Sequence, residues 1–580
     1  MPRLTEPFST SPKYVRSAAR AALPSALSGV IALVLTVGYG LADGLAATLG
    51  VATLLIAPLV LTGALFHSRS AATAIGVDVS LLATASTLWL LGMDGAAAVA
   101  LSVWLLIVVV RVLRATDEGK EALDRLPGQP SRLLLVSIVS TIVVGALFLT
   151  VPAATLDGQG TTFVDAIFMS TSATCVTGLS VVNLVADGLH NPSLTTLTPF
   201  GQFVLLVLVQ IGGLGIMTLS AAVVIVLGGR IGPGAHKALQ SSVEEEHRRH
   251  LERSLRKIFQ MTLVIEAVGA ALLFLRFYPV MGDVGLAAWH SVFLSVSAFN
   301  NAGFALFSDN LISYRSDLLV NLVVMGLITA GGLGFLVIAT LTRWKLYRQS
   351  AESTWHRFPP QVRVVVTFSA LLTLAGTVLF YYFDFDRSLD GLSRGDKLVA
   401  AAFQSVTFRT AGFNTVDLSE ISRVTLVISL ILMYVGGSPG GTAGGVKTTT
   451  VAVAAFAVIA MLRGRDDVEI GDRTVPKAVV YRSIAILLSF TGMFVVGAIL
   501  MLIAEPDKSL DSLLFETMSA LGTVGVSFGI TPYCSAVGKM VLVMLMFAGR
   551  VGPLSMALAI GEDVRGRAGV KLPEGKMMVG

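Results

Sequence analysis

Cysteine and charge are both scarce in this sequence. Only two of its 580 residues are cysteine, Cys175 and Cys534, so neither a disulfide framework nor a thiolate metal cluster is available. Charged residues make up 14% of the chain, whereas a soluble domain usually carries about 25%. Acidic residues are especially rare inside the apolar runs, which disfavours a proton pump or a carboxylate-based enzyme.

Catalytic and nucleotide-binding motifs are missing as well. The sequence contains neither an HExxH zinc motif nor a GxSxG nucleophile elbow. The stretch GGTAGGVKT is faintly similar to a phosphate-binding loop, but Val446 separates the glycine from Lys447 and no strand pattern precedes it. We therefore expect that the protein is not an enzyme. A membrane-embedded enzyme or receptor stays open as the alternative, and it would need a convergent set of titratable or metal-binding residues.

Long apolar runs, in contrast, are abundant. Hydrophobic residues make up 54% of the chain, and many runs approach the roughly 20 residues that cross a bilayer core of about 30 Å. They predict an all-α polytopic protein of the cell membrane, surrounded by lipid. The main runs are 22–42, 47–66, 132–153, 203–228, 258–275, 318–342, 363–382, 424–435, 448–462, 483–503 and 540–560. The first run follows basic residues and resembles a signal peptide, but we interpret it as a retained helix.

Basic residues cluster between these runs and predict the orientation. The net charge of +5 does not indicate nucleic acid, because Lys and Arg gather in the pattern of cytoplasmic loops. The segments predicted to be cytoplasmic are 230–257, 343–363 and 463–482, and both termini are expected on the same side. The segments predicted to face outward are 155–200, 278–315, 384–420 and 505–538. The first two basic segments either dock a partner or only set the topology.

A short pattern ending in glycine occurs four times. The copies are SATCVTGLS, SAFNNAGFA, VTFRTAGFN and SALGTVGVS, and their glycines lie 125, 109 and 113 residues apart. Each copy stands between two apolar runs and follows a segment of about a dozen residues, which is too short to span and is typical of a re-entrant helix. An aromatic residue stands ten residues before three of the glycines, at Phe168, Phe293 and Phe515, whereas Phe403 is displaced by one.

The repeat predicts four pseudo-symmetric helix–pore loop–helix units around one pore, with about four extra N-terminal spans. The predicted boundaries are 1–130 for the N-terminal extension, 131–229, 230–343 and 344–464 for the first three repeats, and 465–580 for the fourth repeat with a short tail.

Glycine in each copy suits a cation filter. It adopts φ values closed to other residues, and such backbone can turn carbonyls toward an axis to replace the hydration shell of a cation. The predicted filter residues are Val176, Thr177, Gly178, Asn301, Ala302, Gly303, Thr410, Ala411, Gly412, Thr523, Val524 and Gly525. Asn300 and Asn301 are expected to hydrogen-bond behind the filter or at its mouth. Ordinary helix-capping turns are the alternative, but four copies in register favour the pore.

A second glycine-rich element follows each copy. The elements are QIGGLGIMTLS, TAGGLGFLVIAT, GGSPGGTAGGVKTTT and FAGRVGPLS. The third has six glycines and Pro439 within ten residues, which cannot hold a continuous helix and predicts a flexible loop that gates the path. A kink or a close helix-packing patch is the alternative. The predicted gate residues are Gly436, Gly437, Ser438, Gly440, Gly441, Gly444, Gly445, Lys447 and Arg550. Arg550 is expected to hold this loop or repel cations, whereas Lys447 either takes part in gating or snorkels to the interface.

The stretches CVTGLSVVN, SAFNNAGF, RTAGFNT, GTVG and GRVGPLS resemble the Trk/Ktr/HKT superfamily of potassium transporters, and residues 130–580 are most similar to the KtrB type of membrane subunit. The resemblance implies uptake of potassium, with K+ at the filter and one glycine from each repeat. It also implies a homodimer and a cytoplasmic RCK-type ring, KtrA or TrkA-like. A nucleotide would then act on the gate only by binding to this ring. The tail KLPEGKMMVG resembles the short C-terminus of that family.

Three departures bear on these expectations. Residues 1–130 are extra relative to a minimal Ktr subunit, Phe408 stands where proline is common, and the gate loop is intermediate between the Trk and Ktr versions. Sodium as a coupled ion therefore stays open, and a sodium-selective or sodium–potassium symporting member is the alternative. Gly178 argues for potassium, since sodium-preferring members of the plant branch carry serine there.

Overall fold

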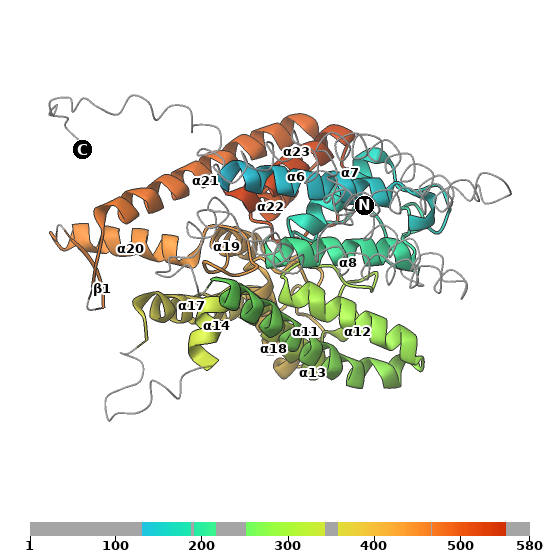
Figure 1. Ribbon diagram of the computed structural model, residues 1–580, viewed down its shortest axis with the longest axis horizontal. Helices are drawn as coiled ribbons and strands as arrows, with labels where there is room; N and C mark the ends of the chain where they lie inside the picture. The colour runs from blue at the N-terminus through green and yellow to red at the C-terminus, as the bar shows by residue number, and fades with distance from the viewer. Residues whose placement is uncertain are drawn as a thin grey trace, which may run out of the picture.

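The structure is a computed structural model that describes residues 130–186, 191–215, 251–342, 358–465, 467–471 and 473–552, and these are mostly helical (Figure 1). The predicted N-terminal spans before residue 130, most of the basic segments 230–257 and 343–363, and the tail lie outside the described residues. Within the described part, three helices are long and apolar enough to cross a membrane: Lys257–Met281, Pro360–Phe383 and Lys477–Ala504.

The helices follow one another in four groups, each with a first helix, a second helix of 12 to 16 residues that is called the short helix below, and one or two further helices. The first group is α6 (Pro130–Leu149), α7 (Phe163–Thr174) and α8 (Pro199–Leu214). The second is α11 (Leu251–Met281), α12 (Val284–Phe299), α13 (Leu318–Leu333) and α14 (Phe335–Thr342). The third is α17 (Pro360–Phe383), α18 (Arg394–Thr407), α19 (Arg423–Tyr434) and α20 (Thr448–Leu462). The fourth is α21 (Lys477–Ala504), α22 (Leu510–Leu521) and α23 (Ala536–Val551).

Short elements connect these helices. The 3-10 turns are η3 (Pro152–Ala154), η4 (Ile312–Tyr314), η5 (Leu418–Glu420) and η6 (Thr531–Tyr533). Strands β1 (Val468–Ile470) and β2 (Arg473–Val475) form an antiparallel hairpin between α20 and α21, with Val468 opposite Val475.

The short helices α7, α12, α18 and α22 begin in the same way. Each follows a polar residue whose side chain accepts a hydrogen bond from a backbone N–H in the first turn. Such a cap satisfies one of the free donors at a helix start and contributes about 1 kcal/mol. The capping residues are Thr162, Asp283, Ser393 and Ser509.

The groups pack around one another in chain order. Helix α8 contacts α12 of the second group, α13 contacts α18, α19 contacts α22, and α23 returns to contact α7 of the first group. This arrangement places the C-terminal ends of the four short helices at the centre. The aromatic residues of the repeated pattern, Phe168, Phe293, Phe403 and Phe515, are all fully buried.

One predicted continuous span is wrong. The apolar run 318–342 is divided at Gly334 into α13 and α14, because Gly334 takes a left-handed φ of 87° that ends the helix. The helices in the runs 203–228 and 540–560 end in the same way, at Gly215 and Gly552. The remainders of these two runs lie outside the described residues.

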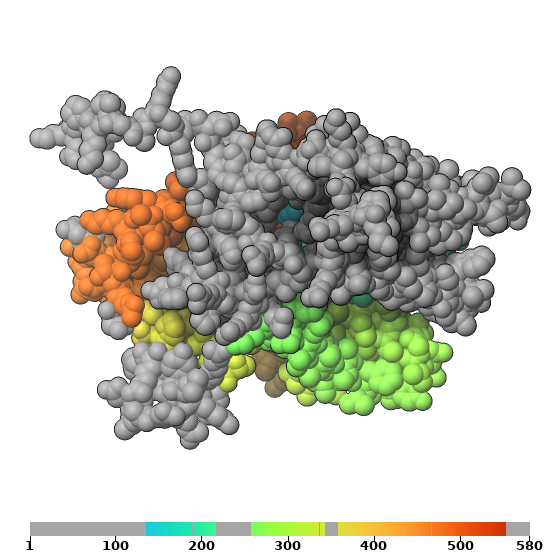
Figure 2. Space-filling model, in the orientation of Figure 1, coloured from blue at the N-terminus to red at the C-terminus, as the bar shows by residue number. Residues whose placement is uncertain are grey.

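The long helices expose apolar side chains. Val264 of α11, Leu374 of α17 and Leu488 of α21 are 62%, 63% and 69% exposed. Helices α11, α12 and α13 form the green lobe of the face drawn in Figure 2. Apolar side chains at such a surface suit contact with lipid acyl chains, and the protein is a membrane protein.

Candidate functional site

The loops that follow the four short helices share an unusual backbone. Two residues before each glycine, φ is positive: 56° at Val176, 60° at Asn301, 72° at Thr410 and 49° at Thr523. The glycines themselves have φ values between 73° and 102°. A left-handed φ is a genuine outlier for a β-branched residue, and this backbone conformation costs about 1–3 kcal/mol of folding free energy. Because such strain gathers at ligand sites, its recurrence at equivalent positions makes these loops the candidate site.

The glycine of each loop lies against the backbone of another loop. The first glycine faces the second loop, the second faces the third, the third faces the fourth, and the fourth faces the first. A Cβ added at Gly412, for example, would lie 2.6 Å from the carbonyl oxygen of Val524 and 2.8 Å from the Cα of Gly303. Only a residue without a side chain fits these places, so the loops close into a tight ring.

Carbonyl oxygens line this ring. The residue before each glycine turns its carbonyl oxygen toward the glycine of a neighbouring loop, and these residues are Thr177, Ala302, Ala411 and Val524. Of the twelve carbonyls at the predicted filter positions, only that of Gly303 accepts a hydrogen bond from the described residues. Buried carbonyls are nearly always paired. Eleven free oxygens in one place therefore form a site that suits a cation.

The described residues contain no group of three or more His, Cys, Asp or Glu that could hold a metal ion.

Hydroxyl groups at the ends of the short helices hold the loops. The Oγ of Ser172 accepts from the N–H of Gly178 (3.1 Å) and donates to the carbonyl of Leu179 (2.7 Å). Ser519 accepts from the N–H of Gly525 at 3.0 Å. These bonds fix the backbone that carries the free carbonyls.

The third loop differs by one residue. In the other three, the N–H of the residue before the glycine donates to a carbonyl five positions earlier, whereas Ala411 donates to Thr407, four positions earlier. Thr407 therefore takes the place of Ser172, and its hydroxyl donates to the carbonyl of Phe413 at 2.7 Å. Phe403 stands one helical turn before Thr407, just as Phe168 stands one turn before Ser172. The third loop is one residue shorter between this hydroxyl residue and its glycine, which explains why Phe403 is displaced by one position relative to Gly412.

The second glycine-rich elements serve close packing in three cases. Gly212 of α8, Gly331 of α13 and Gly549 of α23 each lie against the carbonyl of the last residue of a short helix. A methyl group at any of these glycines would collide with that carbonyl. Small residues commonly allow such close packing between membrane helices.

The third element is a loop of residues 435–447 between α19 and α20. The N–H of Ser438 donates to the carbonyl of Gly332 (2.9 Å), and that of Thr442 donates to the carbonyl of Gly331 (3.1 Å). The hydroxyl of Thr442 donates to the carbonyl of Phe299, the last residue of α12, at 3.1 Å. The loop is thus seated directly against the base of the ring.

Arg550 and Lys447 both bond to this loop. Nη1 of Arg550 donates to the carbonyl of Thr442 at 2.6 Å, and its other terminal nitrogen donates to the carbonyl of Gly212. Nζ of Lys447 donates to the carbonyl of Ala443 at 2.7 Å, so this side chain turns back into the loop. The structure thus brings the residues that the sequence assigned to filter and gate into one connected cluster.

Comparison with known proteins identifies the family. The model of the TrkH family, described as a cation transport protein, matches residues 96–563. The chain belongs to this TrkH family. It is 36% identical over 466 residues to Ktr system potassium uptake protein B of Vibrio alginolyticus, covering 80% of this chain and 97% of that protein. The Bacillus subtilis protein of the same name is 34% identical and covers 78% and 97%.

The solved structure of the potassium transporter TrkH from Vibrio parahaemolyticus has a similar fold. Its TM-score is 0.63 at 19% identity, covering 83% of this chain and 95% of that one. The resemblance stated from the sequence is confirmed. The relatives are named as transporters, which agrees with the expectation of a protein that is not an enzyme.

Sequence reasoning missed a buried polar cluster of this TrkH family member. Glu266 of α11 is 5% exposed and accepts hydrogen bonds from Gln210 of α8 (3.2 Å) and from Asn300 at the end of α12 (3.0 Å). Asn300 also donates to Gln210 at 2.9 Å. An acidic residue inside an apolar span was the available signal. As predicted, Asn300 bonds behind the second loop, and the cluster joins three helices there.

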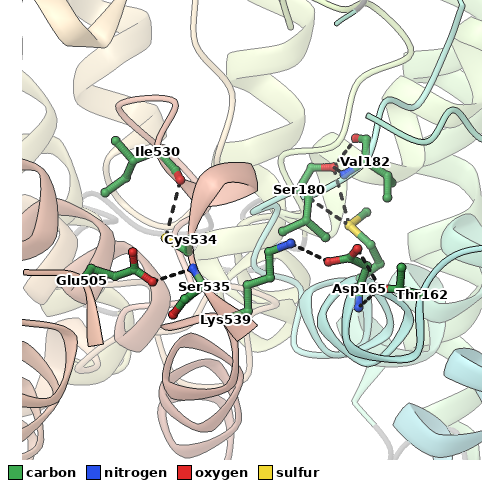
Figure 3. Close-up of polar contacts among 11 residues, drawn as sticks. Thr162, Asp165, Ser180, Val182, Glu505, Ile530, Cys534, Ser535 and Lys539 are labelled. Atoms are coloured by element: carbon green, nitrogen blue, oxygen red, sulfur yellow. Dashed lines mark hydrogen bonds and ion pairs between the residues drawn. The ribbon is translucent and has the colours of Figure 1, made fainter. Parts of the chain in front are cut away.

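The contact between α7 of the first group and α23 of the fourth carries an ion pair (Figure 3). Lys539 of α23 donates to Asp165 of α7 at 2.7 Å, with both side chains at least four-fifths buried. Beside it, Glu505 accepts from the N–H of Ser535, which caps the start of α23. Burial raises the pKa of the Cys534 thiol to about 12, so this cysteine stays protonated at neutral pH.

Proposed function

We propose that the four loops form a selectivity filter through which the protein takes up potassium. The eleven filter carbonyls that accept no hydrogen bond from the described residues are the observation that carries this proposal. Oxygens of this kind can replace the water around a dehydrated cation. K+ is then the ion held at the filter, and the residues assigned to it from the sequence supply the oxygens.

We also propose that the four helix groups are pseudo-symmetric repeats around one pore. The shared caps, strained loops and buried aromatics support the predicted boundaries 131–229, 230–343, 344–464 and 465–580. Residues 1–130 are proposed to add about four spans, on the basis of their apolar runs.

The loop 435–447 is proposed as the gate of this pore. It lies against the base of the ring, where a cation that leaves the filter inward must pass. Arg550 supports this role, because it bonds to the loop and to α8 and adds a positive charge near the path. Movement of the loop away from this seat would open the path.

Potassium is favoured over sodium as the transported ion. The relatives from Vibrio alginolyticus and Bacillus subtilis are named for potassium uptake, whereas a further relative from Enterococcus hirae, 33% identical, is named for potassium and sodium. Gly178 lies so close to the second loop that a serine there would displace its backbone. The sodium-selective or symporting alternative is therefore not favoured.

Regulation is proposed to come from a partner. The relatives are named as members of a Ktr system, which supports a cytoplasmic RCK-type ring that binds the nucleotide and acts on the gate. We further propose a homodimer in the cell membrane, with both termini cytoplasmic, as the basic segments indicate.

The test is uptake of rubidium-86 into proteoliposomes that contain the purified full chain, with unlabelled potassium or sodium as competitor. We expect potassium to compete and sodium to compete poorly, and we expect Gly178→Ser to let sodium compete. Gly158→Ser is the matched control, because Gly158 also has a positive φ of 66° but has no atom within 4 Å of an added Cβ. Equal competition by the two ions in the wild type would refute the proposal.

A further inference from the structure

One of the twelve filter carbonyls differs from the rest. The carbonyl of Gly303 accepts a hydrogen bond from Nδ2 of Asn310 at 3.2 Å. The carbonyls of the other three filter glycines accept none from the described residues. The ring formed by the four glycines is therefore asymmetric, with three free oxygens and one that is held.

Asn310 is itself held firmly. Its φ of 59° is left-handed, a conformation that asparagine tolerates better than most residues. Its Oδ1 accepts from the N–H of Asn414, two residues beyond the third glycine, at 3.4 Å. The adjacent Leu311 donates its N–H to the carbonyl of Asn414 at 3.1 Å. The side chain that holds Gly303 is thus tied to the backbone of the third loop.

We propose that Asn310 is a positioning residue that sets the discrimination between potassium and sodium, and this inference rests on the proposed filter. Sodium is the smaller ion, so a ring that binds it well must contract. A carbonyl tied to Asn310 cannot swing freely toward the axis. The held oxygen therefore keeps the glycine ring at the wider spacing that suits potassium.

Substitutions at Asn310 separate its conformation from its hydrogen bond. Asn310→Gly keeps the left-handed backbone and removes the amide. Asn310→Asp keeps the size and the acceptor for Asn414, but an ionised carboxylate cannot donate to Gly303. Asn414→Ala is the matched control, because among the described residues the Asn414 side chain bonds only to the carbonyl of Val416 (3.1 Å), while its backbone N–H donates to Asn310.

Ion binding is measured by the thermal unfolding midpoint of the detergent-solubilised full chain in titrations with potassium chloride and sodium chloride. A bound ion stabilises the folded state by RT ln(1 + [ion]/Kd), so the rise of the midpoint with ion concentration gives the dissociation constant, and the assay requires neither an open gate nor a partner. Rubidium-86 uptake with the two competitors is the second measurement. For Asn310→Gly we expect the ratio of sodium to potassium dissociation constants to fall about three- to tenfold, the effect of losing one hydrogen bond.

The outcomes distinguish this inference from the proposed function. A reduced ratio in Asn310→Gly and Asn310→Asp, with Asn414→Ala like the wild type, supports the role of Asn310. An unchanged ratio in both Asn310 variants overturns that role and leaves the filter standing. A wild-type chain that responds equally to both ions overturns the filter and the inference together. If Asn310→Gly does not fold, Asn310→Asp decides alone.

Discussion

The hydroxyl of Thr442 offers a direct test of whether the loop 435–447 is a gate. This hydroxyl is the only donor, among the described residues, to the carbonyl of Phe299 at the end of α12. Thr442→Val has nearly the same shape but no hydroxyl, so the loop loses this bond and a buried carbonyl is left unpaired. The backbone bond of Thr442 to Gly331 is unaffected.

The expected effect follows from that lost bond. Leaving a buried carbonyl unpaired costs about 1–2 kcal/mol, which is equivalent to a shift of about five- to thirtyfold in an equilibrium. If the described structure is the closed state, the shift favours opening. Rubidium-86 uptake by the chain alone should then rise by up to this factor, while potassium should still compete better than sodium because the filter is unchanged.

Thr442→Ser is the matched control, because serine keeps the hydroxyl and loses only a methyl group. Its uptake should stay close to that of the wild type. Unchanged uptake in Thr442→Val, with normal folding, would refute the reasoning that this loop closes the path. An equal rise in both variants would also refute it, since the hydroxyl would then not be the cause.

Three further predictions concern the same framework. In Arg550→Gln, the shorter side chain can reach only one of the two carbonyls, those of Thr442 and Gly212, to which Arg550 donates. We therefore expect higher rubidium-86 uptake than in the wild type and a lower unfolding temperature. Lys539→Met removes the cation that pairs with Asp165, whose carboxylate then keeps the hydrogen bond from the hydroxyl of Thr162. The loss should destabilise the contact between α7 and α23 by about 1–3 kcal/mol, and a double-mutant cycle with Asp165→Asn measures the coupling. Gly549→Ala should lower the unfolding temperature, whereas Gly326→Ala should not, because only the first added methyl group meets a carbonyl.

The sequence predicted the parts of the fold that depend on local pattern. Apolar length predicted the long helices, and the runs 424–435 and 448–462 lie within a residue or so of α19 and α20. Glycine at Gly178 and its counterparts predicted loops of unusual backbone, because few residues tolerate a positive φ. The break at Gly334 was missed, since a single glycine in an apolar run is weaker punctuation than the six glycines of the third element.

Contacts between distant segments could not be predicted in the same way. Glu266, Gln210 and Asn300 come from three helices, and nothing in their local sequence indicates that they meet. The one-residue difference in the third loop appeared in the sequence only as the displaced Phe403, and its cause required the hydrogen bond between Ala411 and Thr407.

The chemistry of the ring explains why its position was easier to predict than its side-chain partners. Backbone oxygens face the centre, so the flanking residues can vary: Val176 and Asn301 adopt nearly the same φ with unrelated side chains. Within the filter positions, only the glycine is dictated by space and conformation, and it recurs in every copy. Residues outside the ring, such as Asn310 and Thr442, bond to main-chain carbonyls that any residue supplies. The carbonyls that these side chains contact therefore cannot be identified from the sequence, and only the folded structure shows the contacts.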